Sequence, residues 1–134
     1  MRILLDTHVL VWFLQGAAEL TEETRAMITD GKNDVFYSAV SVWEVSVKHA
    51  LHPDNMRIGG REFSELCRAS GLYMLPLTDE HVYALDTLRR NADAPRHKDP
   101  FDRMLLSQAK AEEMMFLTHD PMFSGYHEAC VSLI

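Results

Sequence analysis

Two acidic residues stand just beyond short apolar runs, where a carboxylate could take part in chemistry. Asp6 follows the run Ile3–Leu5, and Asp120 follows the run Met114–Leu117 after a short polar turn. Each also stands where a helix would begin, so the simpler interpretation of each is an N-terminal helix cap. Because ligands of parallel sheets bind beyond the carboxyl ends of the strands, the two carboxylates could instead share one crevice.

Three further acids lie on predicted helices. Glu44 shares roughly one helix face with apolar residues, so an acid there is out of pattern; the alternative is an ion pair with Lys48, four residues on. Asp99 and Asp102 flank a Pro-Phe pair, and as N-cap and N3 residues they would form a regular helix start. Both positions also present these carboxylates toward the crevice at the strand ends.

If these side chains meet in space, the chemistry that they favour is metal-assisted hydrolysis. Carboxylates brought together raise one another's pKa by repulsion, which is unfavourable without a positive counter-charge. Hard divalent cations such as Mg²⁺ or Mn²⁺ supply that charge through oxygen ligands, and they activate water for attack on a phosphodiester. The candidate acids are Asp6, Glu44, Asp99, Asp102 and Asp120.

Other chemistries lack their sequence patterns. The histidines and cysteines do not have the spacing of a zinc site. The chain has neither a glycine-rich nucleotide loop nor a Gly-x-Ser-x-Gly nucleophile motif. A phosphotransfer domain with Asp6 as nucleophile would need a second aspartate where His8 stands, so that enzyme class is disfavoured.

The composition is that of one ordinary globular domain. The 134 residues carry 13 Lys and Arg against 20 Asp and Glu, a net charge of −7, which argues against a simple non-specific nucleic-acid binder but not against a nuclease. No apolar run approaches the ~18 residues of a membrane-spanning helix, and an acid interrupts the apolar N-terminus, unlike a signal peptide. Cys67 and Cys130 form no disulfide pattern, so we expect a cytoplasmic protein without a membrane partner.

Short apolar runs alternate with helical periods along the chain, which is typical of a parallel α/β sheet. We predict strands over 3–5, 35–37, 72–75, 114–117 and 131–134. We predict helices over 9–14, 22–29, 38–51, 61–69, 79–90 and 100–113, with loops over 52–60 and 91–98. The predicted fold is a single-domain α/β/α sandwich over residues 1–134 with a mostly parallel central sheet of about five strands.

Four segments together resemble the PIN-domain ribonucleases, and most closely the VapC-type toxins of bacterial toxin–antitoxin systems. The segments are Leu4–Trp12, Ser38–Lys48 with its glutamate, His97–Leu105, and Leu117–Asp120, in the family's order along the whole chain. The family's four acids fall on Asp6, Glu44, Asp102 and Asp120. Asp99 is an additional acid of the Asp-Pro-Phe-Asp subgroup, and Thr7 and Thr118 match polar positions that support the acids.

The resemblance implies a Mg²⁺- or Mn²⁺-dependent endoribonuclease that forms homodimers and is inhibited by a co-expressed antitoxin protein. The alternative is an inactive PIN-fold module that binds RNA or a protein without cleaving it. That alternative predicts a lost acid, and none of the acids is missing from this sequence.

Basic residues concentrate between positions 89 and 103, where they could steer RNA phosphates. The alternative for each is a solvated basic face. These residues are Arg89, Arg90, Arg96, Lys98 and Arg103. His97 and His119 are candidates for an acid–base group, with surface or capping roles as the alternative.

Overall fold

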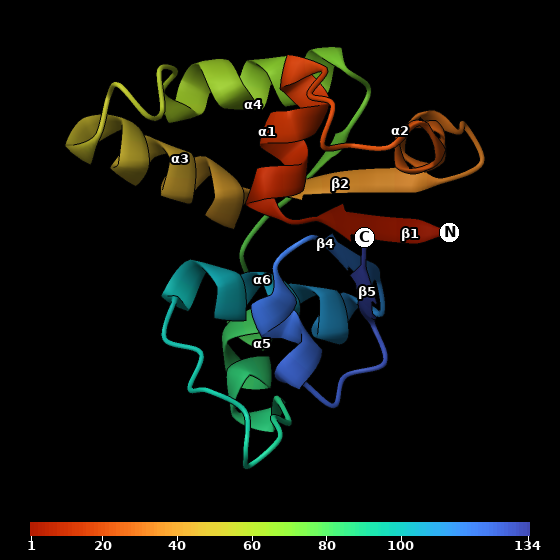
Figure 1. Ribbon diagram of the computed structural model, residues 1–134, viewed down its shortest axis with the longest axis vertical. Helices are drawn as coiled ribbons and strands as arrows, with labels where there is room; N and C mark the ends of the chain where they lie inside the picture. The colour runs from red at the N-terminus through yellow and green to blue at the C-terminus, as the bar shows by residue number, and fades with distance from the viewer.

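Five parallel strands form the centre of the protein in the computed structural model, which describes residues 1–134 (Figure 1). The strands are β1 (Arg2–Leu5), β2 (Asp34–Ser38), β3 (Tyr73–Leu75), β4 (Met115–Thr118) and β5 (Val131–Leu133). They pair in the order β3-β2-β1-β4-β5, and every pairing is parallel. The predicted fold class is therefore confirmed.

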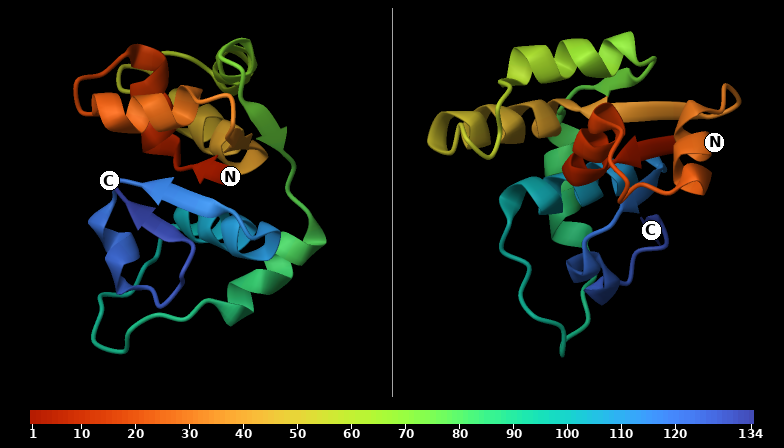
Figure 2. Two further views of the ribbon diagram at one scale, coloured as in Figure 1. Left: turned by 90° about the vertical axis from the view of Figure 1, so that its right-hand side faces the viewer. Right: turned by 45° about the horizontal axis from the view of Figure 1, so that its top comes forward.

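Helices cover both faces of the sheet (Figures 1 and 2). The first face is covered by α1 (Thr7–Gln15), α2 (Glu22–Thr29), α3 (Ala39–Leu51) and α4 (Gly60–Ala69). The opposite face carries α5 (Asp79–Tyr83), α6 (Pro100–Glu112) and the 3₁₀ helices η1 (Ala84–Thr87) and η2 (Pro121–Gly125). No helix is long and apolar enough to cross a membrane.

The side chains of each strand alternate between two apolar cores, because successive residues of a strand point to opposite faces. Ile3 and Leu5 of β1 belong to the core beneath α1, α2 and α4, whereas Leu4 belongs to the core beneath α6. In β4, Leu117 enters the first core and Phe116 the second. Because both faces of the strands are buried, the strands appear in the sequence as short, continuous apolar runs.

The strand order reverses beside β1. The chain steps from β1 to β2 and β3 in one direction, and then crosses back to place β4 on the other side of β1. The Asp6 amide donates to Leu117 O at 3.0 Å, so the carboxyl ends of β1 and β4 lie together. Crevices at such reversal points are the usual binding sites of open α/β sheets.

One predicted helix was too long. The prediction of a helix over 79–90 is wrong after Tyr83, because η1 follows and residues 88–91 are extended. The extended segment pairs with a distant loop: Asn91 N donates to Gly125 O at 2.8 Å, and His127 N donates to Arg89 O at 2.7 Å. A helix could not make these long-range hydrogen bonds. The other predicted elements agree with the structure to within two residues at their ends.

The close approach of α4 to α3 depends on Gly60, and Gly60→Ala is expected to destabilise the protein. The added methyl group would overlap Ser46 Oγ and lie 2.9 Å from Val42 O, which is backbone and cannot turn away. We expect the free energy of unfolding to fall by about 1–3 kcal/mol, as for other overpacked sites.

Urea denaturation of the parent and two variants measures this effect. The matched control is Gly31→Ala, because no atom lies within 4 Å of a methyl group there. The control should keep or slightly exceed the parent's stability. Equal stability of the two variants would show that α3 and α4 are not packed this closely.

Candidate active site

Five carboxylates converge at the carboxyl ends of the strands. Asp6 follows β1, Asp120 follows β4, Glu44 lies in α3, and Asp99 and Asp102 begin α6. The charges of the other four all raise the pKa of Asp102, so these side chains share one electrostatic environment. The structure thus brings together all five acids that the sequence singled out.

Asp6 is held rigidly at the base of this cluster. Its side chain is 3% exposed, and its two oxygens have separate donors: Oδ1 accepts from Thr7 N at 2.7 Å and Oδ2 accepts from Thr118 Oγ1 at 2.6 Å. Burial raises the pKa of the Asp6 carboxyl, and the two hydrogen bonds only partly oppose that rise. Thr7 and Thr118 therefore orient Asp6, as donors that fix both of its oxygens.

Glu44 is buried on the other side of Thr7. Its Oε1 accepts from Thr7 Oγ1 at 2.7 Å, and because this uses the only hydroxyl proton of Thr7, Ser41 Oγ is the donor in its 2.8 Å contact with Thr7. Lys48 Nζ donates to Glu44 Oε2 at 2.5 Å, so the ion pair considered as an alternative is present. The ion pair does not remove Glu44 from the site, because the glutamate is only 2% exposed and still faces the other acids.

Lys48 brings a positive charge to the rim of the cluster. Burial opposes its charge, but the hydrogen bond to Glu44 and the nearby carboxylates of Asp99 and Asp102 prevail and raise the pKa of the lysine. The sequence had indicated Lys48 only as an ion-pair partner.

Asp99 and Asp120 are helix caps as well as members of the cluster. Asp99 Oδ1 accepts from Phe101 N at 2.9 Å and Asp102 N at 3.2 Å, and Asp120 Oδ1 accepts from Met122 N at 2.9 Å. Each cap uses one carboxylate oxygen and leaves Oδ2 without a protein donor. The capping and functional interpretations of these aspartates are therefore compatible.

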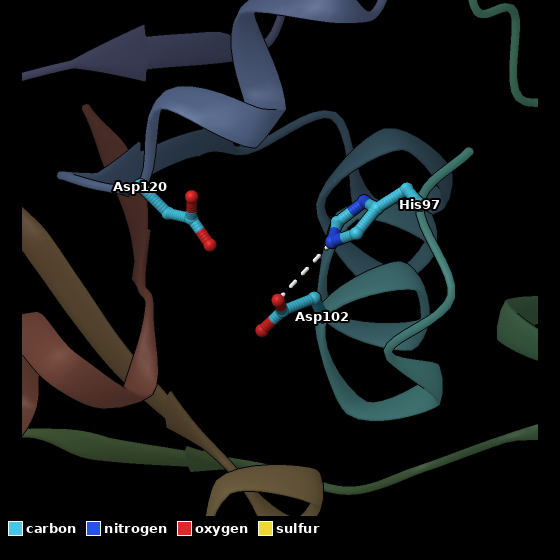
Figure 3. Close-up of side chains that lie close together, drawn as sticks. All are labelled: His97, Asp102 and Asp120. Atoms are coloured by element: carbon cyan, nitrogen blue, oxygen red, sulfur yellow. Dashed lines mark hydrogen bonds and ion pairs between the residues drawn. The ribbon is translucent and has the colours of Figure 1, made fainter. Parts of the chain in front are cut away.

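Asp102, His97 and Asp120 lie close together within the cluster (Figure 3). One ligand atom from each of the three lies within 4.8 Å of the others, and His97 Nε2 is 3.1 Å from Asp102 Oδ2. Burial, and then the charges of the other acids, raise the pKa of Asp102 to about 8.

His97 connects Asp102 to the aromatic side chain of Tyr126. Its Nδ1 is 2.7 Å from the Tyr126 hydroxyl and its Nε2 is 3.1 Å from Asp102 Oδ2. When the hydroxyl donates to Nδ1, the ring proton is on Nε2, which then donates to Asp102. Burial and the charge of Arg90 lower the pKa of His97 despite the acids nearby, which favours this neutral form. His119 is placed differently: its Nδ1 lies 2.8 Å from Ile134 O and its ring contacts Trp12.

These residues fit a divalent cation. Asp99 and Asp120 each have a free oxygen, and the charges of four acids add to burial in raising the pKa of Asp102, so the carboxylates are crowded without enough positive charge among them. Mg²⁺ and Mn²⁺ prefer such oxygen donors, whereas a structural zinc site would need more nitrogen or sulfur ligands.

The predicted basic residues separate into two groups. Arg90, Arg96 and Arg103 line a cavity of about 230 Å³ beside His97. Arg89 and Lys98 are exposed and do not line it.

Comparisons with known proteins agree with this architecture. A family model described as PIN domain matches residues 3–128. One similar solved structure is VapBC2 from Rickettsia felis bound to a promoter DNA fragment, with a TM-score of 0.70 and 13% identity; the match covers 100% of this chain and 98% of that chain. Another is a toxin–antitoxin complex from Klebsiella pneumoniae, with a TM-score of 0.60 and 15% identity; the match covers 97% of this chain and 95% of that chain. FitAcB from Neisseria gonorrhoeae is also similar (TM-score 0.57, 20% identity, 92% and 91%). No curated protein gives a significant match.

The raised pKa of Asp102 predicts how the metal-free protein responds to pH. The folded state holds a proton up to a pH of about 8, whereas the unfolded carboxyl loses it near its ordinary pKa of 3.8. Between those values only the unfolded state gives up its proton, so the free energy of unfolding falls progressively as pH rises. In EDTA at pH 8, we expect Asp102→Asn to be as stable as the parent or more stable, and its stability to decline less between pH 4 and pH 8.

Thermal melting of both proteins across that pH range, with EDTA and with Mg²⁺ or Mn²⁺, tests this prediction. Added metal should stabilise the parent by mass action, and Asp102→Asn should lose most of that gain. Asp79→Asn, at the exposed start of α5, is the control; it should lose about 0.3–1 kcal/mol with or without metal. If Asp102→Asn behaves like this control, Asp102 is only a favourable charge at a helix start.

Proposed function

This chain belongs to the PIN domain family, and we propose that it is a metal-dependent endoribonuclease acting as the toxin of a toxin–antitoxin pair. The observation that carries the proposal is the crowding of five carboxylates at the reversal point of the sheet, where burial, and then the charges of the other four acids, raise the pKa of Asp102 to about 8. A protein keeps such mutually repelling groups together at a cost in stability, and a site for cations offsets that cost.

The proposed ligands of Mg²⁺ or Mn²⁺ are Asp6, Glu44, Asp102 and Asp120, with Asp99 nearby. A cation bound there supplies positive charge for the phosphate and lowers the pKa of a water that attacks the phosphodiester. Thr7 and Thr118 hold Asp6 and Glu44 in fixed orientations, so the carboxylates need not reorganise when substrate arrives. His97 Nε2 holds one oxygen of Asp102 and is placed to exchange a proton with it.

An aromatic pair at the rim supports unpaired RNA as the substrate. Trp43 is 56% exposed although it adjoins the buried Glu44, and its ring meets Phe101 edge to face at 4.8 Å. Phe101 in turn directly precedes Asp102. Exposed aromatic faces stack on bases that are not already stacked in a duplex, so this pair favours single-stranded segments.

The proposed protein partner is a cognate antitoxin, since the similar structures include toxin–antitoxin complexes. A guanidinium from such a partner could occupy the acidic crevice in place of a cation, because it binds carboxylates in a bidentate manner. We also propose that the protein forms a homodimer, the commonest closed symmetry, and that it acts in the cytoplasm, where its RNA substrate would be.

The alternative function, an inactive module that binds RNA or protein, would not need the full set of acids. All five are present and converge, which favours the enzyme. A ribonuclease assay with and without chelator separates the two functions.

We expect purified, antitoxin-free protein to cleave structured RNA in its loops with Mg²⁺ or Mn²⁺ and to lose this activity in EDTA. Asp120→Asn should reduce the cleavage rate by at least ~100-fold, the scale of losing one key electrostatic group. Asp34→Asn, which removes an exposed carboxylate at the opposite end of β2, should cleave at the parent's rate. Cleavage that persists in EDTA would exclude the metal-dependent mechanism.

A further inference from the structure

Three arginines surround one cavity next to the acidic cluster. The cavity has a volume of about 230 Å³ and is lined by Leu88, Arg90, Arg96, His97, Arg103 and Tyr126. The arginines come from the extended segment after η1, from the loop before α6, and from the first turns of α6. Three successive segments of the chain thus bring three positive charges to one small space.

The positive charges around this cavity lack carboxylate partners. The arginines and lysines that form ion pairs with carboxylates are Arg2, Lys48, Arg89 and Lys110. They do not include Arg90, Arg96 or Arg103, although the acids lie nearby. Like charges gathered without partners raise the free energy of the folded state, and a bound anion would relieve that repulsion.

The protein holds Arg90 in a fixed position. Its Nε donates to Pro95 O at 2.8 Å, its Nη1 donates to Met122 O at 2.9 Å, and its guanidinium lies 4.6 Å from the centre of the Tyr126 ring. A methyl group at Gly125 would lie only 2.8 Å from Nη1, so this glycine makes room for the guanidinium. These contacts fix the guanidinium and leave its Nη2 without a protein acceptor, so an anion could bind there with little further loss of side-chain freedom.

The cavity is connected to the acids through a single side chain. His97 lines the cavity with Tyr126, and its Nε2 contacts Asp102 Oδ2 at 3.1 Å. Figure 3 shows His97 reaching from its loop toward Asp102, with Asp120 opposite. An anion in the cavity would therefore be a close neighbour of a group bound at the acids.

We propose that this cavity is a phosphate-binding subsite, which takes a backbone phosphate of the RNA strand next to the phosphodiester presented to the acids. The inference rests on the proposed function for the identity of the strand, but not for the binding of phosphate itself. The forked guanidinium group of arginine matches the several oxygens of a phosphate. Three arginines around one cavity therefore suit a phosphate better than they suit a single carboxylate. The subsite would fix the register of the strand relative to the carboxylates.

Binding of inorganic phosphate to the metal-free protein tests the subsite without any need for RNA cleavage. We would titrate phosphate in EDTA at constant ionic strength and follow it by NMR, with acetate as a second probe. Arg96→Gln and Arg103→Gln should each weaken phosphate binding at least about tenfold, the scale of one charged hydrogen bond. The matched control is Arg89→Gln, whose side chain is 74% exposed and outside the cavity; it should bind phosphate like the parent.

Gly125→Ala tests the preorganisation separately from the charge. It keeps all three arginines but should displace the Arg90 guanidinium, so phosphate binding should weaken although the net charge is unchanged. Acetate that binds as tightly as phosphate would overturn the proposal in favour of a carboxylate from a protein partner. Unchanged phosphate binding in the arginine variants would also overturn it.

Cleavage of RNA oligonucleotides that each carry one neutral methylphosphonate, at a different position in each, shows which phosphate of the strand binds in the subsite. In the parent, one methylphosphonate at a phosphate flanking the cut should slow cleavage. The same methylphosphonate should slow cleavage by Arg103→Gln little further, because that variant already lacks the contact. Phosphate binding that depends on the arginines, in a protein that cleaves no RNA, would support the anion site and overturn the proposed nuclease function. Cleavage without such binding, or without a sensitive flanking phosphate, would overturn the subsite alone.

Discussion

The hydrogen bond from Thr118 Oγ1 to Asp6 Oδ2 joins the ends of the two strands on which the acidic cluster depends. The two residues are 112 positions apart, and they meet because β4 pairs with β1 in parallel. Thr118 Oγ1 also accepts from Asp120 N at 3.1 Å, so one hydroxyl orients two of the acids. Thr7 has the same function between Asp6 and Glu44, donating its backbone amide to one and its hydroxyl to the other.

Helix capping is compatible with the proposed metal binding because a carboxylate has two oxygens. In Asp99 and Asp120 one oxygen satisfies backbone amides at the start of a helix, and the other is free. The positive end of each helix stabilises these negative charges where strand ends already place them. Lys48 balances the acids from within the protein through a direct ion pair, whereas burial lowers the pKa of His97. The charge left over is what a cation would meet.

The sequence predicted the parts of this site that depend on local signals. Each acid stands at a strand end, a helix start or an out-of-pattern helix position, and all five meet in the structure. The sequence did not predict the link from Tyr126 through His97 to Asp102, because it requires a loop to fold against residues near the C-terminus.

The same long-range contact explains two further differences from the sequence predictions. Residues 89–91 pair with 125–127, which ends the predicted helix early and directs Arg90 into the cavity while its neighbour Arg89 stays exposed. Helical periodicity carries no information about such a pairing, because its partner lies more than thirty residues away.

The strand order also determines when the site can exist during protein synthesis. The first core is built almost entirely from residues 3–72, so a nascent chain can begin to pack it while the ribosome is still at work. The acidic cluster is different, because β4 must insert beside the first strand before Asp120 and Thr118 can reach Asp6. A chain that stops before that strand carries Asp6 and Glu44 without their partners, so prematurely terminated translation products would be inert.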